Sequence, residues 1–418
     1  MKAKSERRVV VTGLGVVSPL GSALDCVWSN LLEGVSGIRL LEEYGEDYRC
    51  RVGGRVSGLE LDHYLTPKEQ QRMDPFCWYA VAASDQALAQ GGLKAGEGIA
   101  PEEIGVMISS GIGGLQTIYT QDMRLLKSGP RMVSPMTVPM MIGDMASGMV
   151  AIRHHLQGPN FGIVSACASG LHAVGEAAWV IRRGDAEAML AGGSENGIMA
   201  LGLAAFGSMR ALTSRNQDPQ GASRPFDAER DGFVPGSGAG VLLLEELEHA
   251  RARGAEILAE VSGYGATGDA YHVTAPSADG SGAARAISIA LAHAGVAPEE
   301  VGYVNAHGTS TPMNDAVETK ALKLALGAHA RHVPISSTKS MTGHLLGAAG
   351  GFESLVCVKA VKEGKAPGTI NLHHPDPECD LDYMPNEARA LPGLRHALKL
   401  NMGFGGHNAA VLFSRFEG

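Results

Sequence analysis

The sequence lacks the patterns that are typical of membrane proteins, nucleic-acid-binding proteins and proteins stabilised by metal ions or disulfides. It contains no run of about 18 apolar residues, so a membrane span is not expected. Lysine and arginine total 35 against 44 aspartate and glutamate residues, a net charge of −9. No basic stripe is visible, so nucleic-acid binding is not expected. The six cysteines match neither a CxxC metal site nor a dense disulfide framework.

Two other absences restrict the possible cofactors and the expected location of the protein. No GxxxxGK[ST] motif occurs and Gly111–Gly114 lacks GxGxxG spacing, so we expect no nucleotide cofactor. The basic residues 1–8 precede a short apolar stretch that glycine interrupts. This pattern predicts a lead-in to a first strand rather than a signal peptide, and favours a cytoplasmic protein.

The composition favours a globular protein with a sizeable core. Apolar residues make up 44% and charged residues 19% of the 418 residues. Many of the 56 glycines stand beside alanine or serine, as in Gly347–Gly351, which favours close backbone packing.

The chain also repeats itself over a long interval. Each repeat combines helical, strand and turn signals, which indicates a duplicated α/β fold rather than a solenoid. We predict two related halves, residues 1–255 and 256–418. The repeated segments are 101–106 with 298–303, 180–186 with 360–366 and, more weakly, 9–15 with 259–265.

Cys167 is the candidate nucleophile. Residues 162–170 indicate a strand entering a turn, and 171–183 a helix. The helix N-terminus would favour a thiolate, and the backbone N–H of Cys167 could stabilise an oxyanion. A buried, inert cysteine fits the same pattern.

His307 and His344 each lie at a strand-to-helix junction of the second half. In a pseudo-twofold fold these junctions can converge on the one that carries Cys167. Two neutral imidazoles could donate hydrogen bonds to a thioester oxygen as it becomes an enolate, and one could act as a base or proton donor. The alternatives are core hydrogen bonding or metal ligation, although no HxH or HExxH spacing accompanies either residue.

Three further residues are candidates for supporting roles. A buried pair of Lys339 and Glu318 could orient the histidines, but exposed helix ends fit equally well. Phe404, between two glycines, could be a mobile aromatic, a source of a backbone N–H, or an ordinary core residue in a tight turn.

The chain strongly resembles the β-ketoacyl-acyl-carrier-protein synthases, and the elongating type II enzymes more than type I. The matching segments follow one another over nearly the whole chain. They are VTGLG at 11–15, ACASG at 166–170, RPFD at 224–227, NAHGTSTP at 305–312, KSMTGH at 339–344 and GFGG at 403–406.

This resemblance implies a thiolase-like, five-layered αβαβα fold, usually a homodimer, and a ping-pong condensation. Cys167 would take an acyl chain from acyl carrier protein. Malonyl-carrier protein would then lose carbon dioxide, with His307 and His344 stabilising the enolate, and the product would be a 3-oxoacyl chain two carbons longer. The phosphopantetheine arm would arrive on the carrier protein, so no resident cofactor is expected.

The resemblance also assigns supporting roles. Phe404 would act as a gate and share the oxyanion hole with Cys167, and Lys339 and Glu318 would support the site. Thr309 and Thr311 would contact the phosphopantetheine arm. No catalytic metal is expected, but two positions match those near a structural cation in some members, namely Asn305 and Glu353.

Carrier protein is acidic, so its docking patch should be basic. The best-matched candidates are Lys68, Arg72 and Arg131, followed by Arg124 and Lys127. Solvated surface charges are the alternative for each.

The chain departs from the family at Leu400-Asn401-Met402, where Asn-Ser-Phe is usual. The motion of the Phe404 gate, the preferred length of the acyl chain and the presence of a cation site therefore stay open.

A thiolase would need a second cysteine near the C-terminal glycine-rich loop, where His407 stands. His344 argues against the initiating synthase with its Cys–His–Asn site, and a cysteine protease is poorly supported. Cys167 argues against a non-catalytic chain-length partner, whereas a polyketide-type or specialised ketosynthase stays open.

Overall fold

The computed structural model describes residues 7–418, and a nine-stranded sheet lies at its centre. The strand order is β4-β5-β6-β1-β7-β13-β12-β8-β9. Only two residue pairs, Val10 with Glu260 and Val11 with Ala259, join its four-stranded part to its five-stranded part. The strands are β1 (Val9–Val17), β4 (Ile104–Ser109), β5 (Ala188–Asn196), β6 (Ser237–Glu246), β7 (Ala259–Gly268), β8 (Val301–Asn305), β9 (Ile335–Ser336), β12 (His396–Gly403) and β13 (His407–Ser414).

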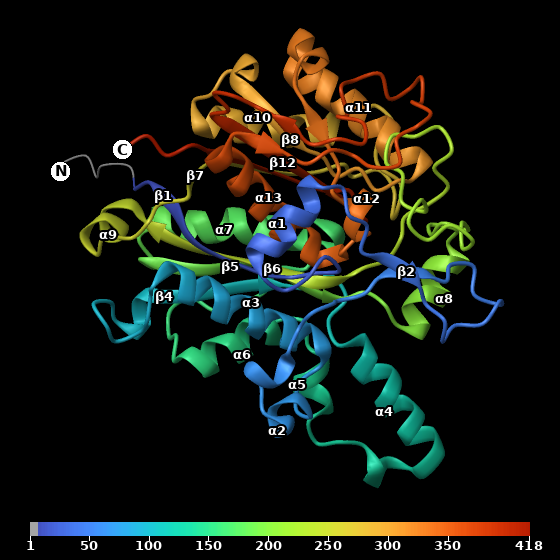
Figure 1. The fold of residues 1–418 in the computed structure, drawn as a ribbon. Helices are drawn as coiled ribbons and strands as arrows, with labels where there is room; N and C mark the ends of the chain where they lie inside the picture. The colour runs from blue at the N-terminus through green and yellow to red at the C-terminus, as the bar shows by residue number, and fades with distance from the viewer. Residues whose placement is uncertain (1–6) are drawn as a thin grey trace.

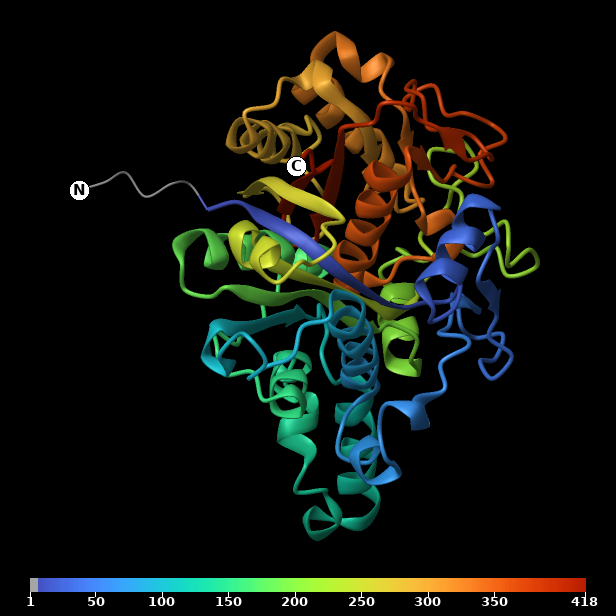
Figure 2. The ribbon, with the colours of Figure 1, turned by 60° about the vertical axis from the view of Figure 1, so that its left-hand side comes forward.

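Three layers of helices alternate with the two parts of the sheet (Figure 1, Figure 2). Helices α3 and α6 cover the outer face of the four-stranded part, α10 and α11 cover that of the five-stranded part, and α7 and α13 lie between the two. The predicted αβαβα arrangement is therefore confirmed. These helices are α3 (Pro75–Gly91), α6 (Met145–His154), α7 (Ser169–Arg183), α10 (Ser281–Ala294), α11 (Pro312–Leu326) and α13 (Ala349–Glu363).

The two parts of the sheet repeat one topology. The order β4-β5-β6-β1 corresponds to β8-β12-β13-β7. In each set the first pair is parallel and the other two are antiparallel. The duplicated fold expected from the sequence is thus present, and all three repeated segments fall on corresponding elements. The division of the chain at residue 255 stays a prediction.

Glycine lets the middle layer pack tightly. A Cβ atom at Gly240 of β6 would lie 2.2 Å from the backbone nitrogen of Phe352 in α13, and one at Gly350 would lie 2.2 Å from that of Leu171 in α7. A side chain at Gly240 would push α13 away from the sheet, and one at Gly350 would push α13 away from α7. The turns that precede α7 and α13 are therefore held side by side, one from each half of the chain.

One expected strand is absent. Residues 161–165, before Cys167, form no strand, because the ladder beside β4 ends at a single bridge between Val106 and Asn160. The backbone N–H of Ile163 donates instead to Ser109 Oγ at 2.9 Å. A hydrogen bond to a side chain thus takes the place of strand pairing just before the turn that holds Cys167.

Most of the remaining elements are peripheral; the buried helix α12 (Lys339–Thr342) is an exception. Helix α4 extends from the main body near α2 and α5 (Figure 1). Across residues 7–418 no helix has the length and apolarity needed to span a membrane. Of the basic segment 1–8 that is predicted to lead into a first strand, residues 1–6 lie outside the described range, and β1 begins directly after Arg8. The other elements are α1 (Leu24–Leu32), β2 (Ile38–Leu40), β3 (Val52–Gly54), α2 (Pro67–Gln70), α4 (Leu115–Ser128), α5 (Thr137–Met141), α8 (Ala200–Ser208), α9 (Leu247–Ala252), α12 (Lys339–Thr342), β10 (Lys365–Ala366) and β11 (Arg389–Ala390).

Candidate active site

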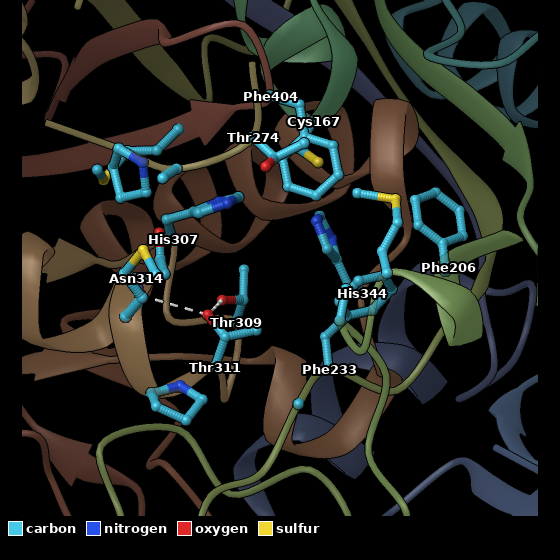
Figure 3. Close-up of a pocket in the computed structure, with 18 of the residues that line it drawn as sticks. Cys167, Phe206, Phe233, Thr274, His307, Thr309, Thr311, Asn314, His344 and Phe404 are labelled. Carbon is cyan, nitrogen blue, oxygen red and sulfur yellow. Dashed lines mark hydrogen bonds between the residues drawn. The ribbon is translucent and has the colours of Figure 1, made fainter. Parts of the chain in front are cut away.

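A cavity of about 320 Å³ brings together residues from both halves of the chain. Cys167, His307 and His344 all line it. In Figure 3 the two imidazoles lie on either side of the cavity, below Cys167 and Phe404. The convergence expected from the three junctions is therefore found in the structure, while the chemical role of each residue stays a proposal.

Cys167 sits in a strained turn. The preceding Ala166 has φ 51°, in the left-handed region that residues other than glycine rarely adopt. A 3-10 turn, Ala166–Ala168, then leads directly into α7. This bend places the sulfur at the cavity wall and the helix behind it.

The expected stabilised thiolate is not found. Burial raises the pKa of Cys167 to about 12, although Lys339 and the backbone N–H groups of Phe404 and Cys167 act in the opposite direction. Loss of solvent outweighs the helix terminus because a sulfur anion is poorly tolerated away from water. The raised pKa therefore favours the thiol form of Cys167 over the thiolate.

His307 and His344 face each other closely. His307 follows β8 after one residue, and His344 follows α12. Their ring centroids are 5.3 Å apart, with the planes at 85°. At this separation the edges of both imidazole rings can contact the same small group of a substrate in the cavity.

Hydrogen bonds fix the same tautomer in both rings. Asn401 Nδ2 lies 3.0 Å from His307 Nδ1, and the Leu346 backbone N–H donates to His344 Nδ1 at 3.2 Å. Each Nδ1 is thus an acceptor, which places the hydrogen of a neutral ring on Nε2. His344 Nε2 is buried and has no hydrogen-bond partner.

Both rings are neutral at ordinary pH. Burial lowers the pKa of His307 and of His344 well below the usual value, and the positive charges of Lys339 and Lys399 lower them further. A neutral imidazole whose Nδ1 accepts a hydrogen bond can donate only through Nε2, so these rings provide two donors of the kind that stabilises an oxyanion.

The predicted pairing of Lys339 with Glu318 is wrong. Both residues are buried, so exposed helix ends are excluded. Lys339 pairs with Glu353, because α12 and α13 place them together in the middle layer. Glu318 accepts instead from the backbone N–H groups of His307 and Gly308, at 2.6 and 2.7 Å, and so holds the turn that carries His307.

A lysine takes the place suggested for a structural cation. Lys399 Nζ donates to the carbonyl oxygens of Asn305 and Ala306 and lies 2.8 Å from Glu353 Oε2. Glu353 therefore faces two ammonium groups. Within residues 7–418 no group of three or more His, Cys, Asp or Glu side chains could hold a metal ion.

Phe404 and the two threonines line the same cavity. A Cβ atom at Gly403 would lie 2.5 Å from the carbonyl oxygen of Ser165, so glycine is needed for the backbone before Phe404 to approach the reactive turn. The hydroxyl oxygens of Thr309 and Thr311 are 2.9 Å apart, which places a polar pair on the wall away from Cys167 (Figure 3).

The basic docking candidates lie elsewhere. None of them lines the cavity, and all are exposed. They are Lys68, Arg72, Arg124, Lys127 and Arg131.

Three buried polar residues that help to form the site are given no role by the sequence pattern. Glu195 accepts from the backbone N–H groups of Gly111 and Gly347 and so ties one half to the other. Lys399 and Asn401 lie on β12 beneath His307. The signal that could have marked Lys399 is a charge between Leu398 and Leu400 within an apolar strand, but only the fold shows what it contacts.

The comparisons with known proteins agree with this geometry. Residues 6–250 match the family described as beta-ketoacyl synthase, N-terminal domain, and residues 258–373 its C-terminal domain. The chain is 51% identical to 3-oxoacyl-[acyl-carrier-protein] synthase 2 of Synechocystis sp., covering 99% of each chain. Its identity to the enzyme of that name from Vibrio cholerae is 49%, over 98% of this chain and 100% of the relative.

Solved structures of similar proteins also share the fold of this chain. A beta-ketoacyl synthase from Burkholderia phymatum superposes with a TM-score of 0.92 at 37% identity, over 98% of this chain and all of that one. A ketosynthase bound to a hexaketide, in complex with its type II polyketide acyl-carrier protein, gives 0.91 at 36% identity, over 99% and 100%. The chain belongs to the β-ketoacyl synthase family.

Proposed function

We propose that the protein is an elongating 3-oxoacyl-[acyl-carrier-protein] synthase of fatty-acid synthesis. The observation that carries the proposal is the cavity in which one thiol faces two neutral imidazoles that share a tautomer. This set suits an acyl transfer followed by a step in which an oxygen gains negative charge.

The first half-reaction loads the nucleophile. Cys167 sulfur attacks the carbonyl carbon of an acyl-carrier thioester, and its proton leaves with the departing pantetheine thiol. The tetrahedral oxyanion accepts hydrogen bonds from the backbone N–H groups of Cys167 and Phe404, which both face the sulfur. Collapse breaks the carrier's carbon–sulfur bond and leaves the chain on Cys167.

The second half-reaction forms the carbon–carbon bond. The malonyl thioester loses carbon dioxide, and its electron pair forms an enolate whose oxygen accepts from the Nε2–H groups of His307 and His344. The enolate carbon attacks the Cys167 thioester carbonyl, the bond from that carbon to the Cys167 sulfur breaks, and the released sulfur takes a proton from solvent. Thr309 and Thr311 would hold the pantetheine arm, and Phe404 would gate the passage between the two substrates.

Fatty-acid elongation is favoured over polyketide synthesis by the degree of similarity. Identity is 51% to a 3-oxoacyl-[acyl-carrier-protein] synthase 2 and 36% to the polyketide ketosynthase. Cys167 argues against a non-catalytic chain-length partner. The six cysteines are unpaired, which suits the cytoplasm proposed as the site of action.

Two kinds of protein partner are proposed. Acyl carrier protein would bind through Lys68, Arg72 and Arg131, whose positive charges complement an acidic surface. A second copy of the chain would cover the segment from Ile118 to Val164, here called the exposed apolar face, because it holds twelve of the twenty exposed large hydrophobic residues within 7–418.

Replacement of the nucleophile tests the overall reaction. Purified protein with acyl- and malonyl-carrier proteins of defined length should give 3-oxoacyl products two carbons longer, measured by mass spectrometry. Cys167→Ala should lower condensation by a factor on the order of 10³ or more, because no acyl-enzyme can form. Wild-type protein without product, or a fully active variant, would refute the proposal.

The two histidines should matter for decarboxylation. His307→Ala and His344→Ala should each slow carbon dioxide release from malonyl-carrier protein by about 10²–10³-fold, because each removes one donor to the enolate. Acylation of Cys167 should be retained. His373→Ala, at an exposed histidine, is the control, and unchanged carbon dioxide release in both variants would contradict the assigned roles.

Charge reversal should separate docking from chemistry. Lys68→Glu, Arg72→Glu and Arg131→Glu combined should raise the KM for carrier-bound substrates about tenfold or more, because like charges then face the acidic partner. The KM for pantetheine thioesters should not change. Arg285→Glu, exposed on α10, serves as the control, and an equal effect on both substrate types would exclude docking.

The exposed apolar face predicts a dimer. Light scattering should give twice the 43.5 kDa mass of one chain. Val164→Glu, at a side chain 69% exposed in the single chain, should shift the protein toward monomer because it would bury a charge in the interface. A monomeric wild type, or a fully dimeric variant, would contradict this use of the face.

A further inference from the structure

Lys399 is a fully buried lysine that no step of the proposed reaction uses. It stands in the middle of β12, and its Nζ donates to the carbonyl oxygens of Asn305 at 3.1 Å and Ala306 at 2.8 Å. Glu353 Oε2 lies 2.8 Å away on another side. Two carbonyls and a carboxylate are ligands that suit a small cation, and here the ammonium fills that place.

The contacts of Lys399 lead to His307 by two routes. Asn305 and Ala306 immediately precede His307, so the ammonium holds the end of the strand from which the imidazole projects. Glu353 Oε2 also accepts from Asn401 Nδ2 at 3.2 Å, and this amide group lies 3.0 Å from His307 Nδ1. Because a carboxylate can only accept, it fixes which end of the Asn401 amide faces the ring.

Charge balance alone does not account for the residue. Lys339 already pairs with Glu353 on the other carboxylate oxygen, so the buried cluster of two lysines and one glutamate carries an excess positive charge. Burial lowers the pKa of Lys399 to about 8 while Glu353 raises it, so the ammonium is the main form at pH 7. A lysine needed only to neutralise Glu353 would be redundant.

We propose that Lys399 is a positioning residue for His307, acting as a built-in cation that fixes the end of β8 and the Asn401 amide. The His307 Nε2–H is thereby aimed into the cavity as a donor. The inference rests on the proposed function, because the enolate is the group that this donor would meet.

Two substitutions separate charge from volume. Lys399→Met keeps the bulk and removes the ammonium, and Lys399→Ala also opens a space between the carbonyls and Glu353. Either change leaves a neutral Lys339–Glu353 pair, so folding should survive and is checked by the thermal unfolding midpoint. Both variants should lower kcat for decarboxylation and condensation about tenfold or more, with little change in the KM for malonyl-carrier protein or in acylation of Cys167.

Chemical rescue tests the cation itself. Potassium or methylammonium chloride should restore at least part of the activity of Lys399→Ala, compared with choline chloride at the same ionic strength. Lys399→Met should not respond, because its thioether fills the space. Unaltered decarboxylation in Lys399→Met, equal loss of acylation and decarboxylation, or a folded Lys399→Ala without rescue would each overturn the proposal.

Two further measurements complete the test. Wild-type condensation is measured first, so failure of the proposed function appears as an inactive wild type and failure of this inference as an active lysine variant. If neither lysine variant folds, Asn401→Leu cuts the link to His307 while keeping the charge. It should show the same selective loss of decarboxylation, and full activity would overturn the proposal.

Discussion

The close contact between the helices of the middle layer is the constraint on which the site depends. Glycines at 240 and 350 let α13 approach both the sheet and α7, and the turns before the two helices consequently meet. Cys167 comes from one turn, and His344 precedes the other. Glu195 adds a buried carboxylate that binds backbone N–H groups of both halves, so the cavity is formed by the contact between the halves rather than by either one.

The electrostatics of the site follow from the same burial. Removal from water keeps Cys167 protonated and both imidazoles neutral, so the resting site stores no ion pair between sulfur and histidine. Lys339 and Lys399 do not line the cavity, but their positive charges act on both imidazoles from behind. Such a site is uncharged at its reactive atoms before substrate arrives and favours negative charge when it develops.

The sequence predicted the parts of the fold and site that depend on local pattern. The repeated segments, the helix after Cys167 and the position of His307 directly after a strand are visible as spacing and periodicity. The partners of buried charges are not visible in this way. Lys339 was assigned to Glu318 by proximity to the histidines, whereas helix packing pairs it with Glu353. The thiolate was expected from a helix terminus, but the depth of burial that overrides it is a tertiary property.

The turn before α13 repeats the bend that carries Cys167, since Leu346 has φ 51° as Ala166 does. The residue that follows Leu346 is Gly347, and a Cβ atom there would lie 2.2 Å from the backbone nitrogen of Gly111. The second bend therefore cannot acquire a thiol of its own unless the first half withdraws its loop. The duplication of the architecture therefore does not double the site: one bend presents a thiol to the cavity, and its counterpart is confined to packing against the first half.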